Sequence, residues 1–141
     1  MTEELKRQLL AFGNEAEPFI AHNHIAVTDL ADGEATVTLS LEEDSLNRWR
    51  TPHGGVLFTM ADVANGMATL TVRQESCVTV NATIDFIAAT DAGQTLTAIG
   101  KVRQLGGKVC FCTTEIFDGA ERLIARLNSV MYFTGKALPL A

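Results

Sequence analysis

One short stretch of the sequence combines residue types that can act on a carbonyl group. His53-Gly54-Gly55 is followed by Asp62, the single charged residue in an otherwise apolar run. Two glycines at the start of a helix leave backbone N–H groups uncovered at the positive end of the helix dipole. Such groups can stabilise negative charge developing on a carbonyl oxygen, as in an oxyanion hole. Helix entry alone would also account for the two glycines.

Asp62 needs a reason to lie in this run. A carboxylate on a helix that packs against a sheet is costly unless it is paired or faces a cavity. We expect Asp62 to face a cleft as a base or a nucleophile, and the alternative is a hydrogen bond to a nearby hydroxyl or amide. Asn65, one turn further on, could support Asp62 through an i, i+3 contact or could be structural.

Gly54 and Asp62 are too far apart to serve one reacting group from the same helix. They are eight residues apart, which is about 12 Å along a helix axis. A polarising N–H and an attacking group must both lie within roughly 3 Å of one carbonyl. If both act on the same bond, one must come from a second copy of the chain. This predicts at least a dimer, with two equivalent sites related by a two-fold axis.

The elements that would position these residues follow from the hydrophobic periodicity. Thr2 is a candidate cap for a first helix, which Gly13 and Pro18 divide or end. Turn signals such as Asp32-Gly33 separate the strands. We expect an α+β fold in which an antiparallel sheet carries helices on one face. The predicted helices are 2–21 and 54–70, and the predicted strands are 25–27, 34–41, 78–88, 95–104, 109–118 and 122–133.

The composition limits the class of protein. Hydrophobic residues make up 47% of the 141 residues, which is typical of a single globular domain. A net charge of -6 argues against nucleic-acid binding, which needs clustered Lys and Arg. We expect no signal peptide and no segment of the roughly 18 apolar residues that span a membrane. The odd cysteine count and the Cys110-x-Cys112 spacing predict buried thiols in a reducing cytoplasm.

The spacing of the polar residues resembles a known family. Asn47-x5-His53-Gly54-Gly55, with Asp62 nine residues beyond the histidine, resembles the active-site element of hotdog-fold thioesterases. It is most similar to the phenylacetate-degradation type of the 4-hydroxybenzoyl-CoA thioesterase superfamily. The run from 79 to 86, followed by Gly93, resembles the family's strand after the helix. The resemblance covers about 20–134 and implies an antiparallel sheet wrapped around a long central helix. The chain would then be one domain, 1–141, with an N-terminal helix at 1–21 and the hotdog core at about 22–134.

The resemblance also implies roles for individual residues. Asp62 would activate a water as general base or attack the thioester directly. The Gly54 N–H of the partner subunit would polarise the thioester carbonyl. Asn47 and His53 would hold that loop and the carbonyl in place.

Further residues are implied as substrate contacts. Thr79 would orient the water, and Thr83 on the same strand is the other candidate. The acyl group would enter between subunits near Phe58, Met60 and Met67, for which core packing is the alternative. The candidates for binding the substrate and the phosphates of coenzyme A are Gly55, Arg48, Arg50, Arg103 and Lys108, although each basic residue could be an ordinary solvated charge.

The leading hypothesis is hydrolysis of an acyl-CoA thioester to a free acid and coenzyme A. It needs no metal and no cofactor. The expected partners are an acyl-CoA substrate and other copies of the chain, as a homodimer or a dimer-of-dimers tetramer, with no nucleic acid and no membrane. Hydration of an enoyl-CoA would require an Asp–His catalytic pair within one motif, and the sequence has no Asp placed a few residues before a His. A non-catalytic acyl-CoA-binding or sensing module and a purely structural oligomer remain as alternatives.

Overall fold

The computed structural model describes every residue from Met1 to Ala141. A split first helix, two strands, a long helix and four strands follow one another in the predicted order. The ten elements are α1 (Glu3–Asn14), α2 (Pro18–His22), β1 (Ile25–Ala31), β2 (Glu34–Ser40), the 3-10 helix η1 (Glu43–Ser45), α3 (Gly54–Val72), β3 (Glu75–Phe86), β4 (Thr95–Leu105), β5 (Val109–Phe117) and β6 (Leu123–Ala137).

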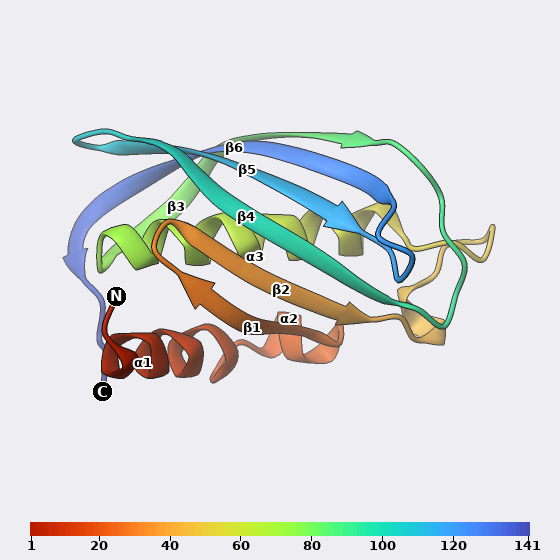
Figure 1. Cartoon of the computed structure of the whole chain (residues 1–141), viewed down its shortest axis with the longest axis horizontal. Helices are drawn as coiled ribbons and strands as arrows, with labels where there is room; N and C mark the ends of the chain where they lie inside the picture. The colour runs from red at the N-terminus through yellow and green to blue at the C-terminus, as the bar shows by residue number, and fades with distance from the viewer.

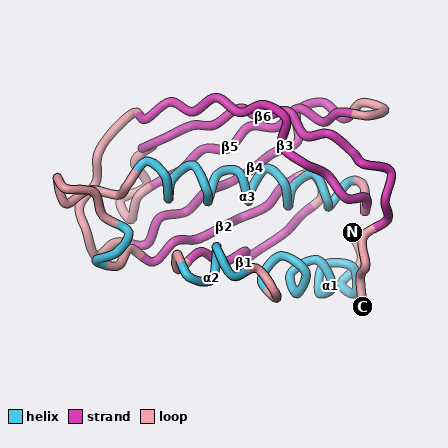
Figure 2. Tube along the Cα trace, turned by 180° about the vertical axis from the view of Figure 1, so that it is seen from behind, coloured by secondary structure: helices cyan, strands magenta, loops and turns pink.

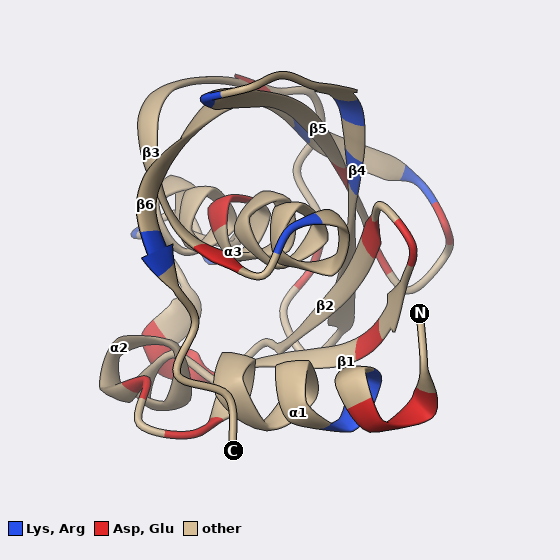
Figure 3. Cartoon of the chain, turned by 90° about the vertical axis from the view of Figure 1, so that its left-hand side faces the viewer, with Lys and Arg blue, Asp and Glu red and all other residues tan.

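The six strands form one antiparallel sheet in the order β1-β2-β4-β5-β6-β3. The sheet curls around α3, which runs along its inner face (Figure 1). Seen from the end of the molecule, the strands surround much of the helix (Figure 3). This confirms the predicted α+β class and the hotdog arrangement, and it places β1 and β3 at the two edges of the sheet.

The first helical region is divided where the sequence predicted a break. The Thr2 hydroxyl caps α1 by accepting a hydrogen bond of 3.1 Å from the Leu5 N–H. The Asn14 side chain, in the last turn of α1, bonds both the N–H and the carbonyl of Val27 and so fixes α1 to β1. Pro18 then begins α2, because its ring suits the first turn of a helix. Seen from behind, α1 and α2 lie beside β1, with both termini close to α1 (Figure 2).

The helix α3 is the centre of the hydrophobic core. Gly100 on β4 permits its close approach, because a Cβ there would lie 2.6 Å from the backbone of Ala64. By length and composition alone α3 would qualify as a membrane span, contrary to our expectation that no segment would. Within the fold 61% of that stretch is buried, so packing inside the sheet accounts for its apolar character.

Asn65 is structural. Its side chain is fully buried, and its amide donates to Ser129 Oγ at 2.8 Å. The Thr114 hydroxyl donates to Asn65 Oδ1 at 2.6 Å. These bonds tie α3 to β5 and β6, and none of them reaches Asp62. The structural alternative for Asn65 is therefore the correct one.

The cysteines are free thiols, as predicted. Cys110 and Cys112 point to the same inner face of β5, where Met131 and Phe133 complete a small cluster. Burial raises the pKa of the Cys112 thiol to about 12. A thiol with so high a pKa is inert at neutral pH, because the thiolate is the reactive form.

Candidate active site

Asp62 and Thr79 are held together between α3 and β3. The Thr79 hydroxyl lies 2.7 Å from Asp62 Oδ1 and 3.3 Å from the sulfur of Met131. A hydroxyl has one proton to donate, and a nearby carboxylate is a stronger acceptor than a thioether. We therefore assign the proton to the bond with Asp62. The lone pairs of the Thr79 oxygen then remain available to accept from a further donor such as water.

The pair opens into a cavity of about 380 Å³. Both Asp62 and Thr79 line it, and most of the other lining side chains are apolar. They come from α1, α2, α3, β3, β6 and Leu138 after the last strand. The two explanations considered for Asp62 thus hold together, since the carboxylate accepts from a hydroxyl and also faces a cavity.

A β-bulge decides which threonine of β3 lies beside Asp62. Thr79 pairs with Met131 and Asn81 with Val130, so Val80 is an extra residue in the strand. One extra residue reverses the faces of a strand from that point onward. Thr83 therefore faces away from α3 and lies in a different pocket, beside Arg103. The structure brings Thr79 to Asp62 and removes Thr83 as a candidate.

At the start of α3 one backbone N–H is left free. The His53 side chain caps the helix by accepting a bond of 2.9 Å from the Gly55 N–H. The His53 carbonyl accepts from the N–H groups of Val56 and Leu57. The Gly54 N–H has no acceptor within the chain. It is therefore the group that can polarise a carbonyl, whereas the Gly55 N–H is already engaged with His53.

The ring of Phe86 packs closely on residue 54. A Cβ on Gly54 would lie 3.0 Å from Cζ of the Phe86 ring, so the ring would have to shift by a few tenths of an ångström. The ring stands at the end of β3 and is 58% exposed. Reasoning from the sequence missed this contact, although Phe86 belonged to the run that resembled the family's strand.

Asn47 organises the loop before α3. Its Oδ1 accepts from the N–H groups of Trp49 and Thr51, and its Nδ2 donates to the Thr51 hydroxyl at 3.0 Å. These bonds close a tight turn, with Arg50 in the left-handed backbone region at φ 65°. The side chain of Asn47 is thus occupied in holding the loop.

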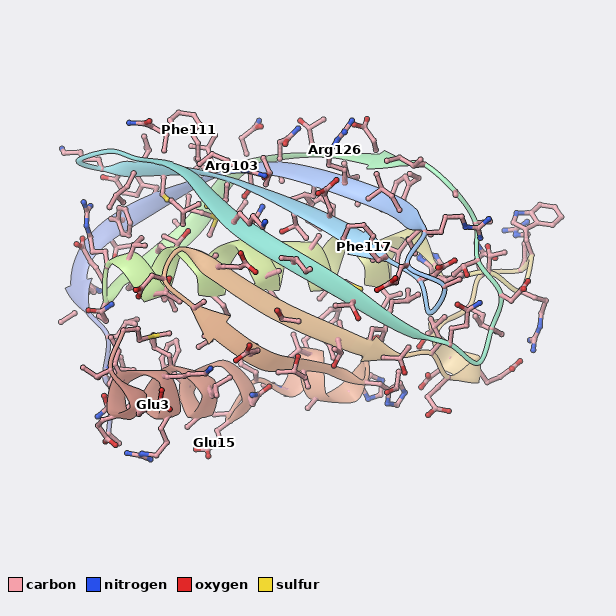
Figure 4. All side chains as sticks on the ribbon, in the orientation of Figure 1. Glu3, Glu15, Arg103, Phe111, Phe117 and Arg126 are labelled. Atoms are coloured by element: carbon pink, nitrogen blue, oxygen red, sulfur yellow. The ribbon has the colours of Figure 1, made fainter.

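The four basic candidates do not form one rim within the chain. Arg48 is exposed and forms no ion pair, whereas the guanidinium of Arg50 binds the carboxylate of Glu43. Arg103 projects from the outer face of the sheet, where it donates to the Thr113 hydroxyl at 2.7 Å (Figure 4). Lys108 lies in the turn between β4 and β5, at the opposite end of the molecule from the Arg48 loop (Figure 1). The four side chains could share a ligand only across subunits.

The three apolar candidates for the acyl group also separate. Met67 lines the cavity beside Asp62. Met60 is fully buried in the core, and Phe58 lies outside the cavity with 37% of its surface exposed. Core packing is therefore the correct interpretation for Met60. The cavity is instead completed by N-terminal residues that the sequence did not indicate, among them Phe12, Gly13 and Ile20.

Comparison with known proteins agrees with this geometry. The family model described as the thioesterase superfamily matches residues 51–125, the segment that contains α3 and β3. The acyl-coenzyme A thioesterase PaaI of Escherichia coli is 33% identical over 101 residues, covering 72% of this chain and 71% of that protein.

Solved structures extend the likeness to most of the chain. The structure of E. coli PaaI, from the phenylacetic acid degradation operon, superimposes with a TM-score of 0.86 at 27% identity, covering 95% of this chain and 99% of that one. A hypothetical thioesterase from Streptococcus pneumoniae, crystallised with coenzyme A, gives a TM-score of 0.75 at 26% identity over 80% of this chain and 88% of that one. On these grounds the chain belongs to the thioesterase superfamily.

Proposed function

We propose that the protein hydrolyses acyl-CoA thioesters to a free acid and coenzyme A, with Asp62 as the attacking or activating group. The observation that carries this proposal is the Asp62–Thr79 pair opening into a largely apolar cavity. A relative of this chain is named as an acyl-coenzyme A thioesterase, and another was crystallised with coenzyme A. A thioester has the two parts that this site suits, an apolar acyl group and a carbonyl carbon that a carboxylate or an activated water can attack.

Two chemical routes use the same residues. In the first, a water that donates hydrogen bonds to Asp62 Oδ2 and to the Thr79 oxygen attacks the thioester carbon and gives a proton to the carboxylate. In the second, the Asp62 carboxylate attacks directly and forms an anhydride, which water then hydrolyses. In both routes the carbonyl oxygen becomes negative and the coenzyme A sulfur leaves as a thiolate that takes up a proton. A backbone N–H stabilises the oxygen in either case.

The Gly54 N–H that stabilises the oxygen comes from a second copy of the chain in this proposal. Gly54 and Asp62 of one chain are about 12 Å apart along α3, at about 1.5 Å per residue. They therefore cannot act together on one thioester carbonyl. The strand β3 is an unpaired edge with exposed apolar side chains at Val78, Val80 and Phe86, which favours pairing with another chain.

Two-fold pairing of β3 edges would assemble the complete site. Thr79 lies beside Asp62, and Phe86 lies against Gly54. If the two-fold axis passes midway between Thr79 and Phe86, antiparallel pairing sets Thr79 of one strand opposite Phe86 of its partner. Asp62 of one subunit then approaches Gly54 of the other, twice per dimer. A homodimer is the smallest active unit, and the basic residues at the two ends of each chain could meet the coenzyme A phosphates across subunits.

The state of the cysteines supports a reducing compartment for this activity. All three thiols are free. Burial raises the pKa of the Cys77 thiol to about 11, with smaller contributions from Cys110 and Asp62. We propose the cytoplasm as the compartment, because thiols stay reduced there.

The decisive experiment is release of coenzyme A thiol from a panel of acyl-CoA esters. The wild-type protein should release thiol, and Asp62→Asn should turn over at least about 10²-fold more slowly because it loses the base or nucleophile. Asp91→Asn, which changes an exposed carboxylate in the loop after β3, is the matched control and should keep full activity. Wild-type protein that binds the esters by calorimetry but releases no thiol would instead be a binding module.

A further inference from the structure

The cavity extends from the Asp62–Thr79 pair along the axis of α3. Asp62, Gly66 and Leu70 are spaced at i, i+4 and i+8, so they lie on one face of the helix, and all three line the cavity. Eight residues of helix cover about 12 Å. The opposite wall is β3 from Thr79 back to Ser76, a span of about 10 Å at the usual rise of a strand.

Leu138 marks the far end of the cavity. It follows β6, and its N–H donates to the carbonyl of Gln74, just beyond the end of α3. Its side chain packs against the main hydrophobic core and lines the cavity together with Leu70. The cavity thus has a reactive end at Asp62 and an apolar end at Leu70 and Leu138.

Gly66 has no packing reason to be a glycine. Glycine inside a helix is less stable than alanine, so its presence there needs an explanation. At Gly100 the explanation is a Cβ that would collide with backbone at 2.6 Å. A Cβ on Gly66 would meet only Cε of Met131, at the ordinary contact distance of 3.8 Å. A side chain at position 66 would instead extend into the cavity, one helical turn from the Asp62 carboxylate.

We infer that this cavity is the acyl pocket of the proposed thioesterase, that Gly66 keeps it open, and that it accepts an uncharged acyl chain of medium length. This inference rests on the proposed function. An extended polypeptide advances about 3.6 Å over the three bonds of each residue, or about 1.2 Å per bond. At the same advance per bond, an extended acyl chain of about ten bonds fits the roughly 12 Å between Asp62 and Leu70. The volume of about 380 Å³ lies at the small end of ligand pockets, which favours medium over long acyl chains.

The lining also selects against acyl groups that end in a carboxylate. Glu17, in the segment between α1 and α2, is one of the lining residues, and Asp62 stands at the reactive end. No basic side chain lines the cavity to pair with a second carboxylate. A second carboxylate would therefore meet carboxylates of like charge without a cationic partner.

The test compares Gly66→Leu with Gly66→Ala and the wild type on esters from acetyl-CoA to palmitoyl-CoA. Wild type should have its highest kcat/KM near octanoyl- to decanoyl-CoA. Gly66→Leu should lower kcat/KM for those esters at least about tenfold more than for acetyl-CoA, because only the longer chains reach the filled space. Gly66→Ala should be the more stable protein and should change the profile much less. Leu138→Ala should move the upper limit toward longer chains.

A second measurement separates failure of the pocket from failure of the proposed function. Calorimetric binding of the non-hydrolysable thioether S-decyl-CoA should be strong for wild type and at least about tenfold weaker for Gly66→Leu, whether or not any ester is hydrolysed. Absence of hydrolysis with this binding difference would overturn the function and support the pocket. Equal binding by the two proteins, a uniform loss across all chain lengths, or a wild-type preference for acetyl or palmitoyl esters would overturn the pocket.

Discussion

The Thr79 hydroxyl and the Asp62 carboxylate are joined by a hydrogen bond of 2.7 Å that connects the edge strand β3 to the central helix α3. The bond fixes the rotamers of both side chains and leaves Asp62 Oδ2 without a partner in the chain. That second oxygen is the atom available to attack a carbonyl or to take a proton from water.

Replacing Thr79 tests the value of this bond. Thr79→Val keeps the shape and removes the hydroxyl, and it should lower kcat about 10- to 10²-fold, the equivalent of one hydrogen bond to a charged group. Thr79→Ser keeps the hydroxyl and should retain most of the activity. Thr83→Val, on the outer face of the same strand, is the matched control and should leave kcat unchanged. Equal activity of Thr79→Val and wild type would remove Thr79 from the reaction.

Mixed dimers test the composite site. Asp62→Asn removes the carboxylate, and Gly54→Pro removes the oxyanion N–H at the first position of α3, where a proline is tolerated. Each variant alone should be inactive. In a 1:1 mixture after subunit exchange, about half of the dimers are mixed and each has one intact site, so about a quarter of wild-type activity should return. Mixed dimers, verified by mass spectrometry of differently tagged chains, that stay inactive would show that the site lies within one subunit.

Asn65 offers a test of stability without a change in chemistry. Asn65→Ala leaves the hydroxyls of Ser129 and Thr114 without their buried partner and should lower the free energy of unfolding by about 2–4 kcal/mol in urea titrations. The folded fraction should keep its kcat, because none of these bonds reaches Asp62. Asn128→Ala, an exposed change next to Ser129 on β6, should alter the stability little. A loss of kcat in fully folded Asn65→Ala would mean that Asn65 supports the site.

Asp118 makes the stability depend on pH. The N–H of Arg122 donates to its Oδ1 at 2.9 Å, and this bond is the main reason that the pKa of Asp118 lies below its ordinary value. A lowered pKa means that the folded state prefers the carboxylate, so the stabilisation is present at neutral pH and is lost as the pH falls. Asp118→Asn should lower the urea midpoint at pH 7, and the difference from wild type should shrink below about pH 4. A difference that stays constant with pH would contradict this role.

The elements of the fold could be predicted from the sequence because their signals are local. Alternating residues in the strands and the turn pairs Asp32-Gly33, Gly106-Gly107 and Asp118-Gly119 define the strand order along the chain. The helix α3 is apolar on nearly all sides, so a sheet must surround it. That the sheet wraps around α3 was predicted from the resemblance to the family, because local sequence signals do not specify the curvature of a sheet.

What the sequence did not indicate depends on contacts between distant segments. The packing of Phe86 on Gly54, and the Phe12 and Leu138 walls of the cavity, are tertiary contacts without a local pattern. Arg103 was grouped with Arg48 by charge, although Arg103 projects from the outer face of the sheet (Figure 4) and Arg48 lies in the loop before α3. One signal was present and unused, since Gly66 interrupts a buried helix where packing does not require a glycine.

The extra residue in β3 divides the strand into two segments with opposite phase. Without the bulge, with Val80 paired like its neighbours, alternation from Thr79 would turn Asn81, Thr83 and Asp85 toward α3 and put three polar groups into the core. With it, Ala82 and Ile84 pack on the core while Thr79 alone reaches Asp62. Deleting Val80 would leave a regular strand in which Thr79 still faces Asp62 and Ala82 still faces the core, because the partners Met131 and Val130 are consecutive residues. The bulge is therefore the feature that lets a strand of this length obey both patterns, and forcing Val80 into the ladder should be more damaging than deleting it.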